Sequence, residues 1–251
     1  RRRQRAWVAL APRCDDGWAG NWVTAIGDFA FAFDADGNVS KRTNSSTGEV
    51  TDFNYDHCNH LVTATVHPSE GVAASTTVNL GYDYANRLIS REVDGSKTWI
   101  LYDRDMPMAE FADGATEAST LYLYALDRLD DFHAMWNASS GESWFLKDHL
   151  GSVRGVLDGT GAFVSWVDYD AYGNILGMPP AGLGPIHYAG RSSLEELALY
   201  ENRRCYYDPI IGRFTQPDPM HIAGGDMNLY AYVANNPMDY TAPKGTSAAI
   251  Q

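Results

Sequence analysis

The side chains best suited to ionic chemistry gather in one stretch, residues 199–219. Within sixteen positions it holds three arginines and two aspartates, namely Arg203, Arg204, Arg213, Asp208 and Asp218. Tyr206 and Phe214 lie among them, so the charges have aromatic surroundings. A charge that is partly buried has to be paired, and the planar guanidinium suits both a carboxylate and a ring face. We therefore predict that one of these arginines pairs with Asp208 or Asp218 in a partly buried network.

A strand, a turn and a second strand are expected to position these groups. Tyr206-Tyr207 lies in a run that favours β-structure. Asp208-Pro209 opens a turn, because proline fixes φ and the aspartate can bond its own backbone. Gly212 tolerates a positive φ, and Arg213-Phe214-Thr215 then resumes an extended chain. The charged groups should therefore lie on and beside a short hairpin.

Two other clusters invite a metal-binding or catalytic interpretation. His57-Cys58-Asn59-His60 contains zinc-ligand side chains, and Asp148-His149 lies close to Ser152. Both clusters fall where a turn needs polar residues, and no Gly-x-Ser-x-Gly motif supports a nucleophilic serine. Turn residues are the simpler explanation, so the sequence predicts neither a metal site nor a bound cofactor.

The composition is that of an acidic globular protein. The 251 residues are 45% hydrophobic and carry a formal net charge of −13. Such a surface repels phosphate backbones, which argues against nucleic acid as a partner, and no apolar run reaches the length of a membrane span. Three cysteines, Cys14, Cys58 and Cys205, do not support a disulfide framework. The chain starts without Met, which leads us to expect a fragment of a longer polypeptide.

A short hairpin template recurs along the chain. An aromatic residue is followed by Asp at the next position, by Gly or Asn at the fourth and by an aliphatic residue at the sixth. Residues 33–39, 55–61, 82–88 and 169–175 all fit it. The Asp would cap the turn, and the fourth residue would take a left-handed conformation. A positive φ is therefore predicted at Gly37, Asn59, Asn86 and Gly173.

Such hairpins bury little surface alone and must stack on their neighbours. The predicted fold is all-β, with antiparallel hairpins forming an extended, curved sheet whose inner layer is rich in tyrosine. Convincing helices are scarce in the sequence. Residues 177–185 are rich in Pro and Gly, and we expect them to form a surface connection between the last hairpin and the stretch that follows.

The motifs resemble those of Rhs (YD-repeat) proteins. The hairpin template is similar to the YD repeat, and residues 148–154 (DHLGSVR), 169–173 (YDAYG) and 228–237 (NLYAYVANNP) are similar to motifs of the Rhs repeat-associated core. That core also occurs in the C components of insecticidal toxin complexes and, more distantly, in teneurins. The resemblance implies a spiralling β-sheet shell with a C-terminal core or plug.

The resemblance also suggests how the chain divides. Residues 1–27 would be an N-terminal segment, 28–176 the YD-repeat hairpins, 177–185 a loop, 186–245 the core and 246–251 a tail. The implied function is a shell that encloses or presents a C-terminal polypeptide, which in many members is a toxin. Partners would be that cargo, the rest of the shell or a secretion-system component, in a secreted or cell-surface location. A cell-surface or glycan-binding module is an alternative.

Self-cleavage is the enzymatic alternative. Many members of the family cut themselves after the core at Asp-Pro-x-Gly-Leu, with core aspartates as the protease, which here would be Asp208 and Asp218. Such a pair needs two carboxylates that share a proton. The aligned residues here are Ala242-Pro243-Lys244-Gly245-Thr246, so the motif's aspartate is Ala242 and its leucine is Thr246. These two departures argue against self-cleavage. Two milder departures are Ala198, where the family favours Gly, and Cys205, where it favours Arg.

Overall fold

The computed structural model describes residues 9–10, 22–177, 183–219, 227–245 and 249–250. Within these ranges the chain is almost entirely β-structure. The helical segments are short 3₁₀ turns: η1 (Tyr188–Gly190), η2 (Glu195–Leu197) and η4 (Val233–Asn235). None of the described helices is long and apolar enough to cross a membrane. The predicted all-β fold is confirmed.

One long antiparallel sheet contains fifteen of the described strands, each hydrogen-bonded to the next in chain order. They are β1 (Ala9–Leu10), β2 (Val23–Ile26), β3 (Phe29–Phe33), β4 (Val39–Asn44), β5 (Val50–Tyr55), β6 (Leu61–His67), β7 (Thr76–Tyr82), β8 (Leu88–Val93), β9 (Ser96–Asp103), β10 (Met106–Ala112), β11 (Thr120–Tyr124), β12 (Phe132–Asn137), β13 (Gly141–Lys147), β14 (Val153–Asp158) and β15 (Phe163–Trp166). From β2 onward, short connections join successive strands, which is why each of these strands pairs with its neighbours in sequence.

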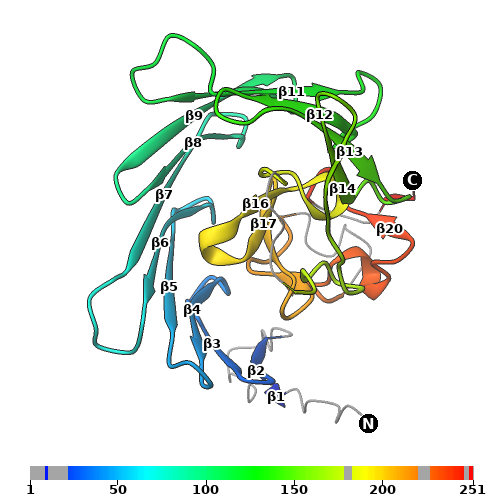
Figure 1. The fold of residues 1–251 in the computed structure, drawn as a ribbon. Coiled ribbons are helices and arrows are strands. Elements are labelled where there is room, and N and C mark those ends of the chain that lie inside the picture. Colours follow the sequence, from blue (N-terminus) through cyan, green and yellow to red (C-terminus); the bar gives the residue numbers. More distant parts are fainter. Residues whose placement is uncertain (1–8, 11–21, 178–182, 220–226, 246–248, 251) are drawn as a thin grey trace.

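The repeat itself bends this sheet. The strand register shifts at Phe33, Tyr55 and Tyr82, the aromatic residue of the template, and again at Lys147, which takes that position before Asp148. An extra residue in one strand bends it and increases its twist. Repeated at the same end of successive hairpins, these bulges curl the sheet into the open C seen in Figure 1.

A smaller sheet lies inside the curl (Figure 1). It has the order β16 (Ser192–Leu194), β17 (Leu199–Asn202), β18 (Cys205–Asp208) and β19 (Arg213–Phe214). The last two strands, which pair Asp208 with Arg213, are the hairpin expected from the sequence. A further pair, β20 (Tyr240–Thr241) and β21 (Ala249–Ile250), follows toward the C-terminus. We call residues 183–245, as far as they are described, the plug.

The plug is held between two hydrophobic clusters. One joins inward residues of β3–β8, such as Leu61 and Val78, to Leu199 and Tyr206 of the plug. The other joins Phe132 and neighbouring inward residues of β12–β14 to Tyr200 and Tyr207. Because successive side chains of a strand point to opposite faces, Tyr206 and Tyr207 serve different clusters. The small sheet therefore packs against both arms of the long one.

The predicted turn conformations are confirmed. Gly37, Asn59, Asn86 and Gly173 have φ values of 88°, 62°, 63° and 91°. These positive angles place each fourth residue of the template in the left-handed region, where glycine and asparagine are the least strained.

The 177–185 connection is described only at its ends, because residues 178–182 lie outside the described ranges. At Leu183 the expectation of a surface position was wrong. Its side chain is 3% exposed and belongs to the hydrophobic cluster that contains Phe132. An apolar side chain at the end of the loop gains more from this cluster than from solvent.

Candidate functional site

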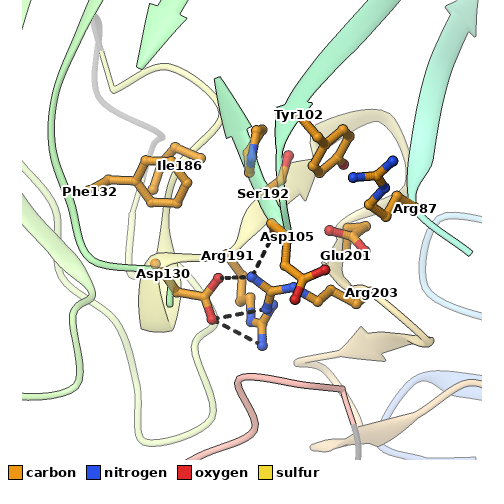
Figure 2. A pocket seen from close by; sticks show the side chains of 12 residues that line it. Arg87, Tyr102, Asp105, Asp130, Phe132, Ile186, Arg191, Ser192, Glu201 and Arg203 are labelled. Carbon is orange, nitrogen blue, oxygen red and sulfur yellow. Dashed lines mark hydrogen bonds and ion pairs between the residues drawn. The ribbon is translucent and has the colours of Figure 1, made fainter. Parts of the chain in front are cut away.

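A carboxylate of the long sheet binds two arginines of the plug. Asp130 lies in the loop between β11 and β12, Arg191 precedes β16, and Arg203 lies in the turn between β17 and β18. The guanidinium of Arg203 meets both carboxylate oxygens of Asp130, at 2.8 and 3.1 Å, and Nη2 of Arg191 lies 3.2 Å from Oδ2 (Figure 2). All three side chains are largely buried. Their charges are therefore lightly screened and depend on one another.

The same two arginines hold the chain just before the C-terminal tail. Arg191 donates to the carbonyl oxygen of Ala242, and Arg203 donates to that of Pro243. The amide of Gly245 closes a turn onto the Ala242 oxygen at 2.9 Å. We call residues 242–245 the exit turn. Asp130 thus orients two guanidiniums that in turn fix the backbone of the exit turn.

Glycine is required at the end of the exit turn. Gly245 has a φ of 67°, and a Cβ there would lie 1.7 Å from the carbonyl oxygen of Asn202. The backbone of Gly245 therefore sits directly against the β17–β18 turn, which carries Arg203. Any side chain at residue 245 would force the exit turn away from the β17–β18 turn.

A cavity of about 30 Å³ adjoins the ionic cluster, with Arg87, Tyr102 and Glu201 on its wall (Figure 2). That volume holds a water molecule but no larger ligand. Burial raises the pKa of the Glu201 carboxyl, although Arg191 and Arg203 oppose the change. Burial also lowers the pKa of the Arg191 guanidinium, opposed by Asp130. The ion pairs and the cavity lie where the long sheet meets the plug.

A second buried ion pair links the opposite arm of the sheet to the plug. Arg42 of β4 lies 3.1 Å from Asp208 of β18, and the two side chains are 6% and 2% exposed. The guanidinium also donates to the carbonyl oxygen of Leu197 at 2.7 Å. Burial raises the pKa of Asp208, opposed by Arg42. The plug is therefore tied to both arms of the sheet by charge as well as by packing.

Two of the residues in the predicted network have partners outside the stretch. Asp208 binds Arg42 and Arg203 binds Asp130. That Arg203, Arg204 or Arg213 pairs with Asp208 or Asp218 stays a prediction. The turn at Arg203 directs its side chain away from the hairpin and toward the β11–β12 loop. Arg204 is exposed and Arg213 is half-buried on β19. The sequence did not identify Arg42, Asp130 or Arg191 as members of an ionic network, because their partners are far away along the chain. Arg42 is 166 residues from Asp208, and Asp130 is 61 and 73 residues from its two arginines.

The aromatic residues of the stretch do lie in the core, as its composition suggested. The hydroxyl of Tyr206 lies 2.8 Å from that of Tyr82, which belongs to a hairpin template of the long sheet. Phe214 is 2% exposed and meets the ring of Tyr232 edge to face, with centroids 5.7 Å apart. The first contact joins the plug to the long sheet, and the second packs the interior of the plug.

The two candidate catalytic aspartates lie in different settings. The carboxylate of Asp208 is engaged by Arg42. Asp218 is 9% exposed. The pKa of the Cys205 thiol is raised mainly by burial of that thiol and, second, by the negative charge of Asp218. Ala242 is 1% exposed and places a methyl group where the self-cleavage motif has a carboxylate. Thr246 and the residues up to 248, like Cys14, lie outside the described ranges.

Comparison with known proteins identifies the family. The teneurin YD-shell family model matches residues 19–238, which is most of the chain. The chain belongs to this family. It is an Rhs/YD-repeat protein.

Relatives of this YD-shell chain include much longer proteins. It is 29% identical over 261 residues to the toxin protein Tse5 of Pseudomonas aeruginosa, covering 91% of this chain and 19% of that protein. It is 27% identical to the tRNA nuclease WapA of Bacillus subtilis, covering 90% and 9%. It is 26% identical to human teneurin-4, covering 86% and 8%. The chain therefore spans less than a fifth of each of these relatives.

Solved structures agree on the fold. The crystal structure of TcdB2-TccC3-TEV matches 86% of this YD-shell chain and 13% of its own with a TM-score of 0.61, at 17% sequence identity. The Photorhabdus luminescens Tc holotoxin pore, carrying a TccC3 mutation, matches 89% and 13%, also with a TM-score of 0.61 and 18% identity.

Proposed function

We propose that this chain is the plug-bearing part of an Rhs-type shell, and that it holds a polypeptide that continues from its exit turn. The proposed Rhs core is residues 186–245, with residues 28–176 as the repeats that surround it. The observation that carries the proposal is the double anchor of Arg191 and Arg203 on the carbonyls of Ala242 and Pro243. It fixes the point from which any following polypeptide must start.

The kinship with Tse5 and with TccC3-containing complexes supports toxin cargo and the rest of a shell as partners, in a secreted or cell-surface setting. Holding a chain requires only that its first residues be oriented and kept from withdrawing. Two buried guanidiniums on backbone carbonyls do this without depending on the cargo's sequence.

The test extends the chain after Gln251 with an unstructured reporter that carries one site for a specific protease. Cleavage of sites close to Gln251 should be slower than cleavage of the same reporter on an unrelated folded carrier. Arg191→Met should remove most of this protection, whereas Glu195→Gln, at an exposed plug residue, should leave it unchanged. Equal cleavage rates on both carriers would show that the chain does not hold its continuation.

Self-cleavage after the exit turn is the second candidate, and the buried Asp218 is the observation that favours it. Against it stand the methyl group of Ala242 and the engagement of Asp208 by Arg42. The intact mass of the purified chain distinguishes the two proposals. We expect the full mass through Gln251, and Ala242→Asp is the variant in which a product ending near residue 246 should be sought.

A further inference from the structure

The turns of the hairpin template share one hydrogen-bond scheme. In each, Oδ1 of the aspartate accepts the backbone amides two and four residues later, at 2.8 to 3.0 Å. The aspartates are Asp34, Asp56, Asp83 and Asp170 of the template turns, together with Asp148 and Asp158 of two further turns that share the scheme. This scheme uses only the aspartate side chain and the backbone. The scheme itself therefore does not depend on which side chains lie two and four residues after the aspartate.

Those two positions vary freely among the described turns. Counted from the aspartate, the residue two positions later is Asp36, Ala85, Leu150, Thr160 or Tyr172. The residue four positions later is Asn38, Arg87, Ser152, Ala162 or Asn174. In the turn of residues 56–60 they are Cys58 and His60. Of these turns it alone combines a carboxylate, a thiol and an imidazole, and the other turns show that the hairpin forms without them. The thiol and imidazole are thus additions to the turn.

The turn brings the three donor atoms together. One ligand atom each from Asp56, Cys58 and His60 lies within 4.8 Å of the others. Oδ2 of Asp56 and Nδ1 of His60 are already 3.0 Å apart, and the imidazole is held by stacking on Tyr82 with ring centroids 4.8 Å apart. Cys58 is exposed, so its thiol can rotate toward the other two. Oxygen, sulfur and nitrogen donors in this number suit Zn²⁺ with one position left open.

A cavity of about 210 Å³ opens beside these donors. Cys58 and His60 line it from the long sheet, and Arg204 and Gln216 line it from the plug. It has room for water or a small anion in the open coordination position.

We propose that Asp56, Cys58 and His60 bind one Zn²⁺ ion whose fourth position faces the cavity between the sheet and the plug. The metal would take the place of the hydrogen bond between Asp56 Oδ2 and His60 Nδ1, and it would require the Cys58 thiol to lose its proton. Asp56 Oδ1 would keep its two backbone bonds, so the turn would not rearrange. This inference is independent of the proposed holding function.

The other turns supply matched variants that keep the fold. His60→Asn gives the turn the residue found at Asn38 and Asn174, whose side chains bond the aspartate as His60 does. Cys58→Ala gives it the residue found at Ala85. Neither variant should change the melting temperature of the metal-free protein, and both should lose a direct metal ligand.

The experiment is a titration of the reduced, metal-free protein with Co²⁺, followed by displacement with Zn²⁺. A thiolate-to-cobalt absorption band should appear at one Co²⁺ per chain and vanish as Zn²⁺ is added. His60→Asn should weaken binding by more than the ~10–100-fold that loss of an outer partner costs, and Cys58→Ala should abolish the band. Cys14→Ala should leave the band intact. Absence of the band at millimolar Co²⁺, or an equal band in Cys58→Ala, would overturn the proposal.

Discussion

His187 shows how one buried group makes stability depend on pH. The imidazole is 1% exposed and its Nε2 donates to the carbonyl oxygen of Gly184 at 2.8 Å. Nδ1 is buried and has no hydrogen-bond partner. A second proton would therefore be placed on a nitrogen that nothing solvates. Burial accordingly lowers the pKa of His187 to about 4.

The free energy of unfolding should therefore fall as the pH drops from about 6.5 to about 4. In this range the imidazole of His187 is protonated in the unfolded chain but stays neutral in the folded one. The loss attributable to His187 is about 3 kcal/mol, from 1.36 kcal/mol for each pKa unit. It should be complete only below pH 4. Urea unfolding of wild type and His187→Gln, which keeps a donor for Gly184, measures the difference between the two pH profiles. A constant difference between pH 7 and pH 4 would contradict this assignment.

Asp130 carries a second prediction, because it orients both arginines that hold the exit turn. Asp130→Asn removes the negative charge that holds Arg191 and Arg203 in place. Trypsin should then cut after Lys244 at least about tenfold faster, because breaking a buried ion pair costs several kcal/mol. Lys244 is exposed while Gly245 is buried in the turn. The cut at Lys97, within strand β9, serves as the internal reference for general unfolding. Equal acceleration at both sites would mean that the exit turn has no anchor of its own.

At the scale of elements, the template turns set the ends of the strands and the bend of the sheet. The turn of residues 83–87 is representative. Asp83 accepts the amides of Ala85 and Arg87, and its second oxygen meets the Arg87 guanidinium at 2.6 Å. The pKa of Asp83 lies below its usual range because these donors outweigh burial. The next residue, Tyr84, is 98% exposed and takes no part.

Asp83→Ala should lower the free energy of unfolding by about 1–2 kcal/mol, since two backbone amides lose a charged acceptor. Tyr84→Ala, at the adjacent position, should change it by no more than a few tenths, as an exposed substitution does. Chemical denaturation of the three proteins at pH 7 provides the comparison. If Tyr84→Ala costs as much as Asp83→Ala, the hydrogen bonds of the turn do not stabilise the hairpin.

Local features of this fold were predictable because they depend on residues close in sequence. The left-handed residues Asn59 and Asn86 follow from the spacing of a single turn, and the sheet follows from its repetition. The ionic junctions were not predictable, because Arg42 and Asp130 belong to strands or loops like many others. Their partners are set by how far the sheet curls before the plug packs inside it. The sequence motifs show that the plug exists but do not specify this curvature.

For the whole molecule, the central question is whether sheet and plug form one cooperative unit. Leu199 and Tyr206 complete the cluster of β3–β8, while Tyr200 and Tyr207 complete that of β12–β14. Neither arm of the sheet can thus bury its inner face without the plug. This arrangement predicts a single unfolding transition, in which the ion pair of Arg42 and Asp208 contributes to the stability of sheet and plug together.

A double-mutant cycle on that ion pair tests this coupling. Arg42→Met leaves a buried carboxylate unpaired and Asp208→Asn leaves a buried guanidinium unpaired, so each should cost about 3–5 kcal/mol. The double variant should cost clearly less than the sum, because neither charge is then left alone. Lys41→Met is the control. Lys41 is adjacent to Arg42 on β4, but its ion pair with Glu70 is much more exposed. This substitution should leave the urea midpoint unchanged. Additive costs would contradict this coupling. So would separate unfolding transitions, one detected by tryptophan fluorescence and one by hydrogen exchange in β16–β19, because the plug would then unfold independently of the sheet.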